Sequence, residues 1–169
     1  MSVSGQRGLV LLLSLVLMLL LGMLGVSVMA SALQQERMAG NLKVLMQSFE
    51  QAQQVLQKGE ATAPAHSLPC SFCLPPPEAG HVAAAGVYSG AGASSGLAWH
   101  AADGGFYLVQ SLGQSTKARL MPPELPVNLY RITAVYRNGP ARSVLESVIA
   151  QPVDAGHPQW RRILWRQVY

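Results

Sequence analysis

Two cysteines three positions apart offer the clearest chemistry in this chain of 169 residues. Cys70-Ser-Phe-Cys73 has the spacing of a redox-active or metal-binding pair, and His66 and His81 are close enough in sequence to complete four zinc ligands. An exported segment would instead hold the two thiols as a small structural disulfide. We expect the disulfide, because neither histidine has a familiar zinc-finger spacing and no strand–helix pattern surrounds the pair to support redox catalysis.

The other titratable residues form no recognisable catalytic group. His100 and His157 are scattered and are expected on solvated loops. The sequence holds no nucleophile–base grouping, phosphate-binding loop or paired carboxylates of the kinds that enzymes use. We therefore expect a protein that is not an enzyme, with no cofactor, no metal ion and no small-molecule substrate.

A basic and aromatic cluster lies close to the end of the sequence. Its members are two tryptophans and three arginines: Trp160, Arg161, Arg162, Trp165 and Arg166. Such a cluster could contact the phosphates and bases of nucleic acid, but tryptophan with arginine is also typical of protein–protein hot spots. Plain packing and solvation remain a third interpretation. Of the two binding interpretations we favour a partner surface over nucleic acid.

The elements that would position these residues begin with an apolar N-terminal segment. Half of the residues are hydrophobic and 12% are charged, and residues 8–35 contain no charged side chain. As a helix, the 22 residues 9–30 would be about 33 Å long, enough to cross a bilayer core of about 30 Å. Arg7 before this segment favours a cytoplasmic N-terminus and export of the chain beyond the segment. Ala30-Ser31-Ala32 imitates a signal-peptide cleavage site, but the apolar core is too long for a typical signal.

The helical pattern continues beyond the apolar segment. We predict one helix over residues 9–58, with a transmembrane half (9–33) and an amphipathic half (34–58). A stripe at spacings of three and four should pack on the exported domain; its residues are Leu42, Leu45, Phe49, Ala52 and Leu56. Lys58 and Gly59 supply a typical helix end.

Residues 59–127 are rich in proline and glycine, which excludes long regular elements over most of this region. Five of the eleven prolines fall in residues 64–77, and seven glycines fall in residues 80–105. We predict a loop region here. Within it, residues 97–101 and 106–112 are expected to form a hairpin around Asp103-Gly104-Gly105.

Residues 128–169 are expected to form antiparallel strands. Tyr130, Ile132, Ala134 and Tyr136 alternate with polar residues, which is typical of a half-buried strand. The turn signal Asn138-Gly139-Pro140 joins this strand to a second one over residues 142–150, and residues 163–169 could add a last strand. A sheet of four or so strands would cover the helix stripe, so the predicted fold class is α+β.

Short strings on both sides of the apolar segment carry a family resemblance. Gln6-Arg7-Gly8 precedes the segment, and Gln35-Glu36-Arg37-Met38-Ala39-Gly40-Asn41 comes after it. A further string, Tyr130-Arg131-Ile132-Thr133-Ala134, is succeeded by Gly139, Ala141-Arg142 and Val144-Leu145-Glu146-Ser147. With these strings the chain resembles the PilX minor pilins of type IV pili, over about a third of its length. The resemblance implies a pilin-like fold, with a long N-terminal helix packed on a small antiparallel sheet.

The resemblance also implies processing at the N-terminus. A prepilin peptidase would remove a leader, residues 1–8, by cutting after Gly8 and would leave Leu9 as an N-methylated first residue. Most pilins have Glu as their fifth mature residue, where this chain has Leu13. A subunit without that Glu suits a tip or initiating position. The implied partners are other minor pilins, the major pilin and a tip adhesin.

The sequence supports hypotheses about function from three different classes. The first is a minor pilin that takes part in pilus assembly, surface attachment and twitching, held in the inner membrane before it enters the pilus (fimbrium). The second is a single-span inner-membrane protein whose exported domain binds a ligand and never enters a fibre. The third is an anchored periplasmic thiol oxidoreductase, which would need reactive Cys70 and Cys73. A plain signal anchor also remains open for the apolar segment.

Overall fold

The computed structural model of the protein describes residues 4–70, 73–154 and 160–168. The chain divides into two compact units, residues 1–43 and residues 44–169. Residues 1–3 of the predicted leader and His157 lie outside the described residues.

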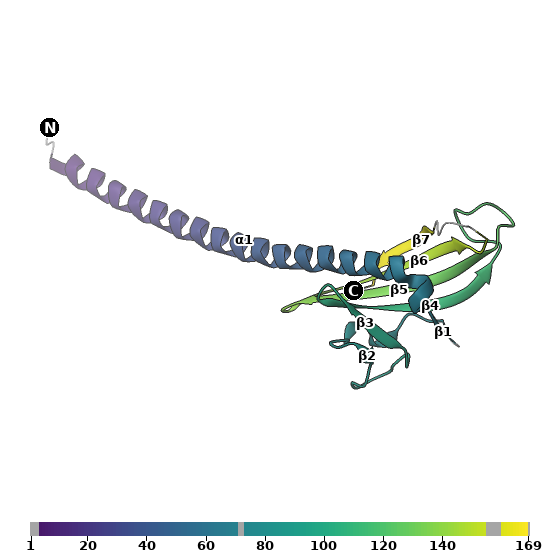
Figure 1. The fold of residues 1–169 in the computed structure, drawn as a ribbon. Helices are drawn as coiled ribbons and strands as arrows, with labels where there is room; N and C mark the ends of the chain where they lie inside the picture. Colours follow the sequence, from purple (N-terminus) through teal and green to yellow (C-terminus); the bar gives the residue numbers. More distant parts are fainter. Residues whose placement is uncertain (1–3, 71–72, 155–159, 169) are drawn as a thin grey trace. The chain divides into compact units, whose positions relative to one another are not determined.

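A single α-helix, α1, extends from Ser4 to His66 (Figure 1). The large apolar side chains described between Leu9 and Leu33 are all exposed. In the part of the chain that the structure describes, α1 is the one helix long and apolar enough to cross a membrane. The helical state predicted for residues 9–33 is confirmed, and its insertion in a membrane stays a prediction.

The predicted end of α1 at Lys58 is wrong, because the helix continues for eight further residues to His66. Gly59 is buried and does not terminate the helix. A Cβ atom at this position would lie 2.7 Å from Cγ2 of Ile132 and 3.0 Å from Cδ2 of Tyr107. Gly59 is therefore a close-approach residue that allows the helix to lie against the sheet.

The second unit contains a seven-stranded sheet (Figure 1). Six of its strands follow the order β2-β3-β4-β5-β6-β7, and the seventh, β1, lies off this path. These strands pair in antiparallel fashion, and β1 pairs with β4 in parallel. The bounds are β1 Leu68–Pro69, β2 Gly86–Val87, β3 Ala98–Ala102, β4 Gly105–Ser115, β5 Val127–Asn138, β6 Ala141–Pro152 and β7 Arg161–Gln167. A short 3-10 helix, η1, spans Pro77–Gly80. The sheet is thus larger than the predicted four or so strands.

Both predicted hairpins are confirmed. Ala102 pairs with Gly105 across the turn that joins β3 and β4. The two turn residues, Asp103 and Gly104, have φ of 49° and 77°, as the tight hairpin turn with two left-handed residues requires. In the β5–β6 hairpin Asn138 pairs with Ala141.

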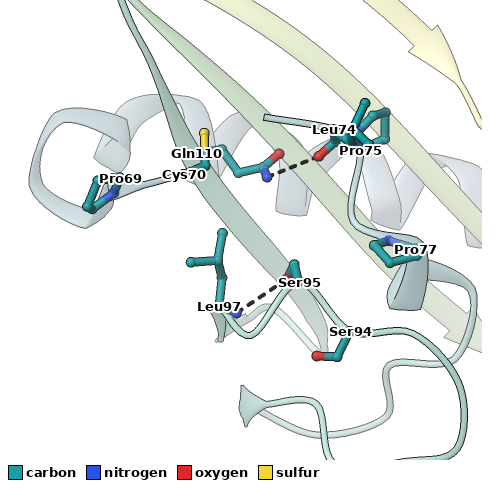
Figure 2. A pocket seen from close by; sticks show the side chains of 9 residues that line it. All are labelled: Pro69, Cys70, Leu74, Pro75, Pro77, Ser94, Ser95, Leu97 and Gln110. Atoms are coloured by element: carbon teal, nitrogen blue, oxygen red, sulfur yellow. Dashed lines mark hydrogen bonds between the residues drawn. The ribbon is translucent and has the colours of Figure 1, made fainter. Parts of the chain in front are cut away.

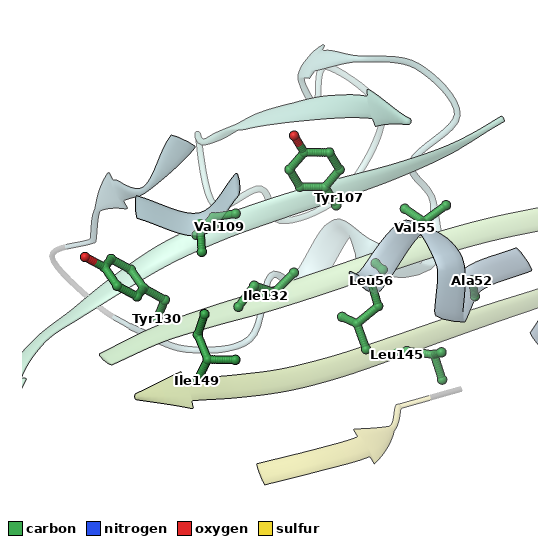
Figure 3. Packing of buried hydrophobic residues seen from close by; sticks show 11 residues of the cluster. Ala52, Val55, Leu56, Tyr107, Val109, Tyr130, Ile132, Leu145 and Ile149 are labelled. Atoms are coloured by element: carbon green, nitrogen blue, oxygen red, sulfur yellow. The ribbon is translucent and has the colours of Figure 1, made fainter. Parts of the chain in front are cut away.

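One face of the sheet packs on the second half of α1 (Figure 3). The helix contributes four fully buried residues, Ala52, Val55, Leu56 and Ala63. The sheet contributes Tyr107, Val109, Tyr130, Ile132, Ala134, Leu145 and Ile149. A long apolar helix packed on a small, mainly antiparallel sheet is the α+β, pilin-like layout that the sequence predicts.

The predicted stripe is only partly confirmed. Ala52 and Leu56 are buried, whereas Leu42 and Leu45 are 53% and 44% exposed and so are not core residues. Phe49 is half-buried at the edge of the cluster. The helix face that the sheet covers is rotated toward Val55 and begins about two turns later than predicted.

A second apolar cluster covers the other face of the sheet, which the sequence did not predict. It contains Ala79, Val82, Trp99, Leu108, Val135 and Val144. Because successive residues of a strand point to opposite faces, Leu108 and Val144 lie opposite their neighbours Tyr107 and Leu145. The predicted loop region 59–127 thus contains the expected hairpin, formed by β3 and β4, and in addition the two-residue strands β1 and β2, which were not predicted. Its proline- and glycine-rich part supplies the cover of the second face.

Candidate functional site

The predicted aromatic and basic cluster lies on and just before β7, an edge strand whose one partner strand in the described structure is β6. Five of the seven β7 residues are exposed, whereas all residues of β6 from Ser143 to Ala150 are buried. Trp160 and Trp165 keep 39% and 41% of their surface exposed. Trp165 meets Phe49 of α1 edge-on, with ring centroids 6.1 Å apart. This edge of the sheet is the candidate interaction site.

Arg162 belongs to the interior of the domain and not to a partner surface. Its Nε and Nη2 donate to the two carboxylate oxygens of Glu60 at 2.7 and 2.6 Å. The Glu60 side chain is fully buried, while that of Arg162 is 31% exposed. Hydrogen bonding to the Glu60 carboxylate raises the pKa of Arg162 against the opposing effect of burial. Arg162 therefore fastens β7 to α1, a structural role not assigned to it from the sequence.

Arg166 is also engaged within the domain. Its Nε donates to Oε1 of Glu146 at 3.0 Å, and its Nη2 lies 2.8 Å from the same oxygen. Nε of Arg131 lies 3.6 Å from the same oxygen, so one buried carboxylate serves two guanidinium groups. Half of the Arg166 side chain remains exposed, and its positive charge is only partly compensated. Arg166 thus makes a structural contact and also presents part of its side chain to solvent.

Among the described residues, Arg161 forms no ion pair. It donates from Nη1 to the backbone oxygen of Leu120 at 2.7 Å, which is a neutral acceptor. The residue is exposed. Its charge is therefore not neutralised by this contact, and its place in a partner surface stays a prediction.

A hollow of about 290 Å³ lies beside the cysteine pair (Figure 2). Cys70 and Cys73 form a disulfide with sulfur atoms 2.03 Å apart, which confirms the expected pairing. The lining is without charged side chains: Pro69, Cys70, Leu74, Pro75, Pro77, Ser94, Ser95, Leu97 and Gln110. Gln110 is 1% exposed; its Nε2 donates to the Leu74 oxygen at 3.1 Å, and its buried Oε1 has no protein partner among the described residues. The described lining of the hollow is thus uncharged, with apolar groups and a few polar side chains.

The histidines do not gather around the cysteines. His66 stacks on His100 with ring centroids 4.5 Å apart, and its Nδ1 lies 2.8 Å from the hydroxyl of Tyr107. Burial and, to a smaller extent, the neighbouring His66 lower the pKa of His100. His81 is exposed. Within the described ranges no three His, Cys, Asp or Glu side chains come together as metal ligands would.

The predicted processing site lies at the start of α1. Gly8, Leu9 and Leu13 are helical, and the side chains of Leu9 and Leu13 are 71% and 59% exposed. Cleavage after Gly8 and methylation of Leu9 stay predictions.

A second hollow of about 290 Å³ opens near Phe49, the residue that Trp165 contacts. It is lined by Leu45, Met46, Phe49, Ser143 and Gln167. Leu45 and Met46 are 44% and 53% exposed. Leu45, a stripe residue that does not reach the core, therefore borders this hollow.

Sequence reasoning missed the two carboxylates that organise the edge strand. Glu60 and Glu146 are both buried, and each holds an arginine of β7. One signal was present in the sequence: Glu60 lies four residues after Leu56 and so shares its helix face. An acid on an apolar helix face requires a basic partner across the interface.

Comparisons with known proteins provide no relative for this chain. No family model matches it, and neither a curated protein nor a solved structure matches it.

Proposed function

We propose that the chain is a minor pilin of the PilX type, which takes part in type IV pilus assembly as a subunit of a priming or tip complex. One observation carries this proposal: a single helix begins with an exposed apolar segment and continues without a break to a buried face against the sheet. In an assembled fibre the apolar segments of neighbouring subunits cover one another. Before assembly, the same segment holds the protein in the inner membrane.

The residues at the N-terminus support the same proposal. Gly8 directly precedes the apolar segment, in agreement with a leader cut after glycine. Leu13 stands where most pilins have Glu, and an apolar residue there suits a subunit with no neighbour on that side. Such a subunit acts through contacts with other minor pilins, the major pilin and a tip adhesin, and it needs no catalytic group.

The hollow beside the disulfide favours a second candidate function. A single-span inner-membrane protein with an exported binding domain would use such a hollow, whose described lining combines apolar side chains with those of Ser94, Ser95 and Gln110. That protein would keep its N-terminus and would never enter a fibre.

Sheared pili distinguish these two functions. The gene for the chain is deleted in the cells that produce it and is then restored on a plasmid. Surface pili are counted by electron microscopy, and the sheared pilus fraction is tested for the chain by immunoblotting. The minor-pilin proposal predicts a large loss of pili, restored by the wild-type chain, and traces of the chain in the sheared fraction. Normal piliation together with strict retention in the inner membrane would favour the second candidate.

A further inference from the structure

The edge strand β7 has the features of a prepared docking strand. It is the longest free edge of the sheet in the described part of the chain, since the opposite end of the strand order is the two-residue strand β2. Edge strands expose backbone N–H and C=O groups that can pair with a further strand. The bonds of Glu60 to Arg162 and of Glu146 to Arg166 hold β7 in place from both faces of the sheet.

The pairing with β6 identifies an outward-facing amide. Val168 donates its N–H to the Val144 oxygen at 2.8 Å. The register from Leu164 to Gln167 is regular, so N–H groups alternate in direction along this stretch. The Leu164 amide therefore faces β6, like that of Val168, and the Trp165 amide faces away from the sheet.

The side chains of β7 differ between the two faces. Arg161 and Arg166 lie on the face of their β6 partners Ala150 and Glu146, and Leu164 shares it. Trp165 lies on the other face, where it meets Phe49. A strand added beside β7 would thus meet cations on one face and an aromatic surface on the other.

The charges decide which partner fits. Residues 160–168 contain three arginines and no acid. In the ion pairs around β7, the carboxylates of Glu60 and Glu146 meet Arg131, Arg162 and Arg166, so positive charge remains even before Arg161 is counted. A second copy of this strand would place like charges side by side, which disfavours a β7–β7 dimer.

We propose that β7 binds an extended segment of another protein, in which acidic and apolar residues alternate and which adds to the sheet as a further strand. Its carboxylates lie beside Arg161 and Arg166, and its apolar residues lie beside Trp165. Backbone hydrogen bonds give such pairing its affinity, while side chains select the partner. The inference does not depend on entry into a fibre, because it rests on the second unit alone.

Binding of designed peptides to the full chain in neutral detergent micelles tests this proposal. The probe is a nine-residue peptide of alternating Glu and Val, and its controls are a Lys–Val peptide and a fully backbone-N-methylated Glu–Val peptide. We expect the Glu–Val peptide to bind at least tenfold more tightly than either control. Equal affinities of the Glu–Val and Lys–Val peptides, or equal affinities of the Glu–Val peptide with and without N-methylation, would overturn the proposal.

Two further measurements locate the peptide. Hydrogen exchange of the Trp165 amide should slow at least tenfold with bound peptide, while exchange of the Val168 amide stays unchanged. Arg161→Glu should weaken binding at least tenfold, and the matched control Arg137→Glu, on the exposed end of β5, should not. An unprotected Trp165 amide, or tighter binding of single-stranded DNA of equal length, would contradict docking of an acidic strand.

Discussion

Removal of the Arg162 guanidinium is expected to destabilise the domain strongly. In Arg162→Leu the fully buried carboxylate of Glu60 loses two hydrogen bonds of 2.7 and 2.6 Å and its only ion-pair partner in the described structure. Breaking one side of a buried ion pair costs about 3–5 kcal/mol. Arg162 is 31% exposed, so water partly replaces it, and we expect about 3 kcal/mol. That is a large share of the roughly 5–15 kcal/mol that stabilises a typical domain.

Urea unfolding of the full chain in detergent micelles, monitored by circular dichroism of the sheet, measures this loss. The double variant Glu60→Leu with Arg162→Leu removes both charges and should recover most of the stability, since an apolar pair of similar size often replaces a buried ion pair without loss. Arg137→Leu is the matched control on an exposed strand end and should stay within about 0.5 kcal/mol. A cost below about 0.5 kcal/mol for Arg162→Leu, or a double variant less stable than the single one, would refute the role assigned to this ion pair.

The remaining predictions concern a glycine and a histidine. Gly59→Ala should destabilise the domain by about 1–3 kcal/mol because the new methyl group overlaps Ile132. Gly40→Ala has open space around the new methyl group and should be neutral or stabilising by up to about 1 kcal/mol. Similar urea midpoints for the two variants would contradict the close approach of Gly59 to the sheet. The pKa of His100 is lowered from its ordinary value of 6.5, chiefly by burial and then by His66. As the pH drops below about 6.5, His100 therefore takes up its proton in the unfolded chain before it does so in the folded one, and the free energy of unfolding should fall. His100→Gln should reduce this fall, and thermal midpoints that change equally with pH in both proteins would show that another group is responsible.

Local signals predicted the hairpins well because their chemistry is contained in a few adjacent residues. Asp103 and Gly104 adopt the left-handed backbone that a two-residue turn requires. The alternation from Tyr130 to Tyr136 likewise reports which side of β5 is covered by the helix. In these cases the sequence pattern and the packing carry the same information.

Signals with two physical meanings misled the prediction. A glycine after a lysine resembles a helix end, yet Gly59 serves the close approach of α1 to Ile132. Leu42 and Leu45 continue the same helical spacing as Leu56, but the spacing does not say how far along the helix the sheet extends. That extent depends on pairing between distant strands.

The sequence could predict which residues form the candidate site, but not which of them make contacts inside the domain. The cluster around Trp165 was considered as a partner surface beside plain packing, and Trp165 both contacts Phe49 and stays partly exposed. Arg162 could not be separated from Arg161, because its partner Glu60 is 102 positions away in the sequence. The same limit applies to the second apolar cluster, since nothing local marks Ala79 or Val82 as cover for β4.

The N-terminus of the protein as it exists in the cell tests the central claim most directly. The chain is extracted from membranes of cells that contain a prepilin peptidase, and its intact mass and N-terminal peptide are measured by mass spectrometry. The minor-pilin proposal predicts loss of residues 1–8, a methylated Leu9 as the first residue, and retention of the leader in Gly8→Ala. A wild-type chain that still begins with Met1, or a Gly8→Ala chain that matures normally, would contradict it.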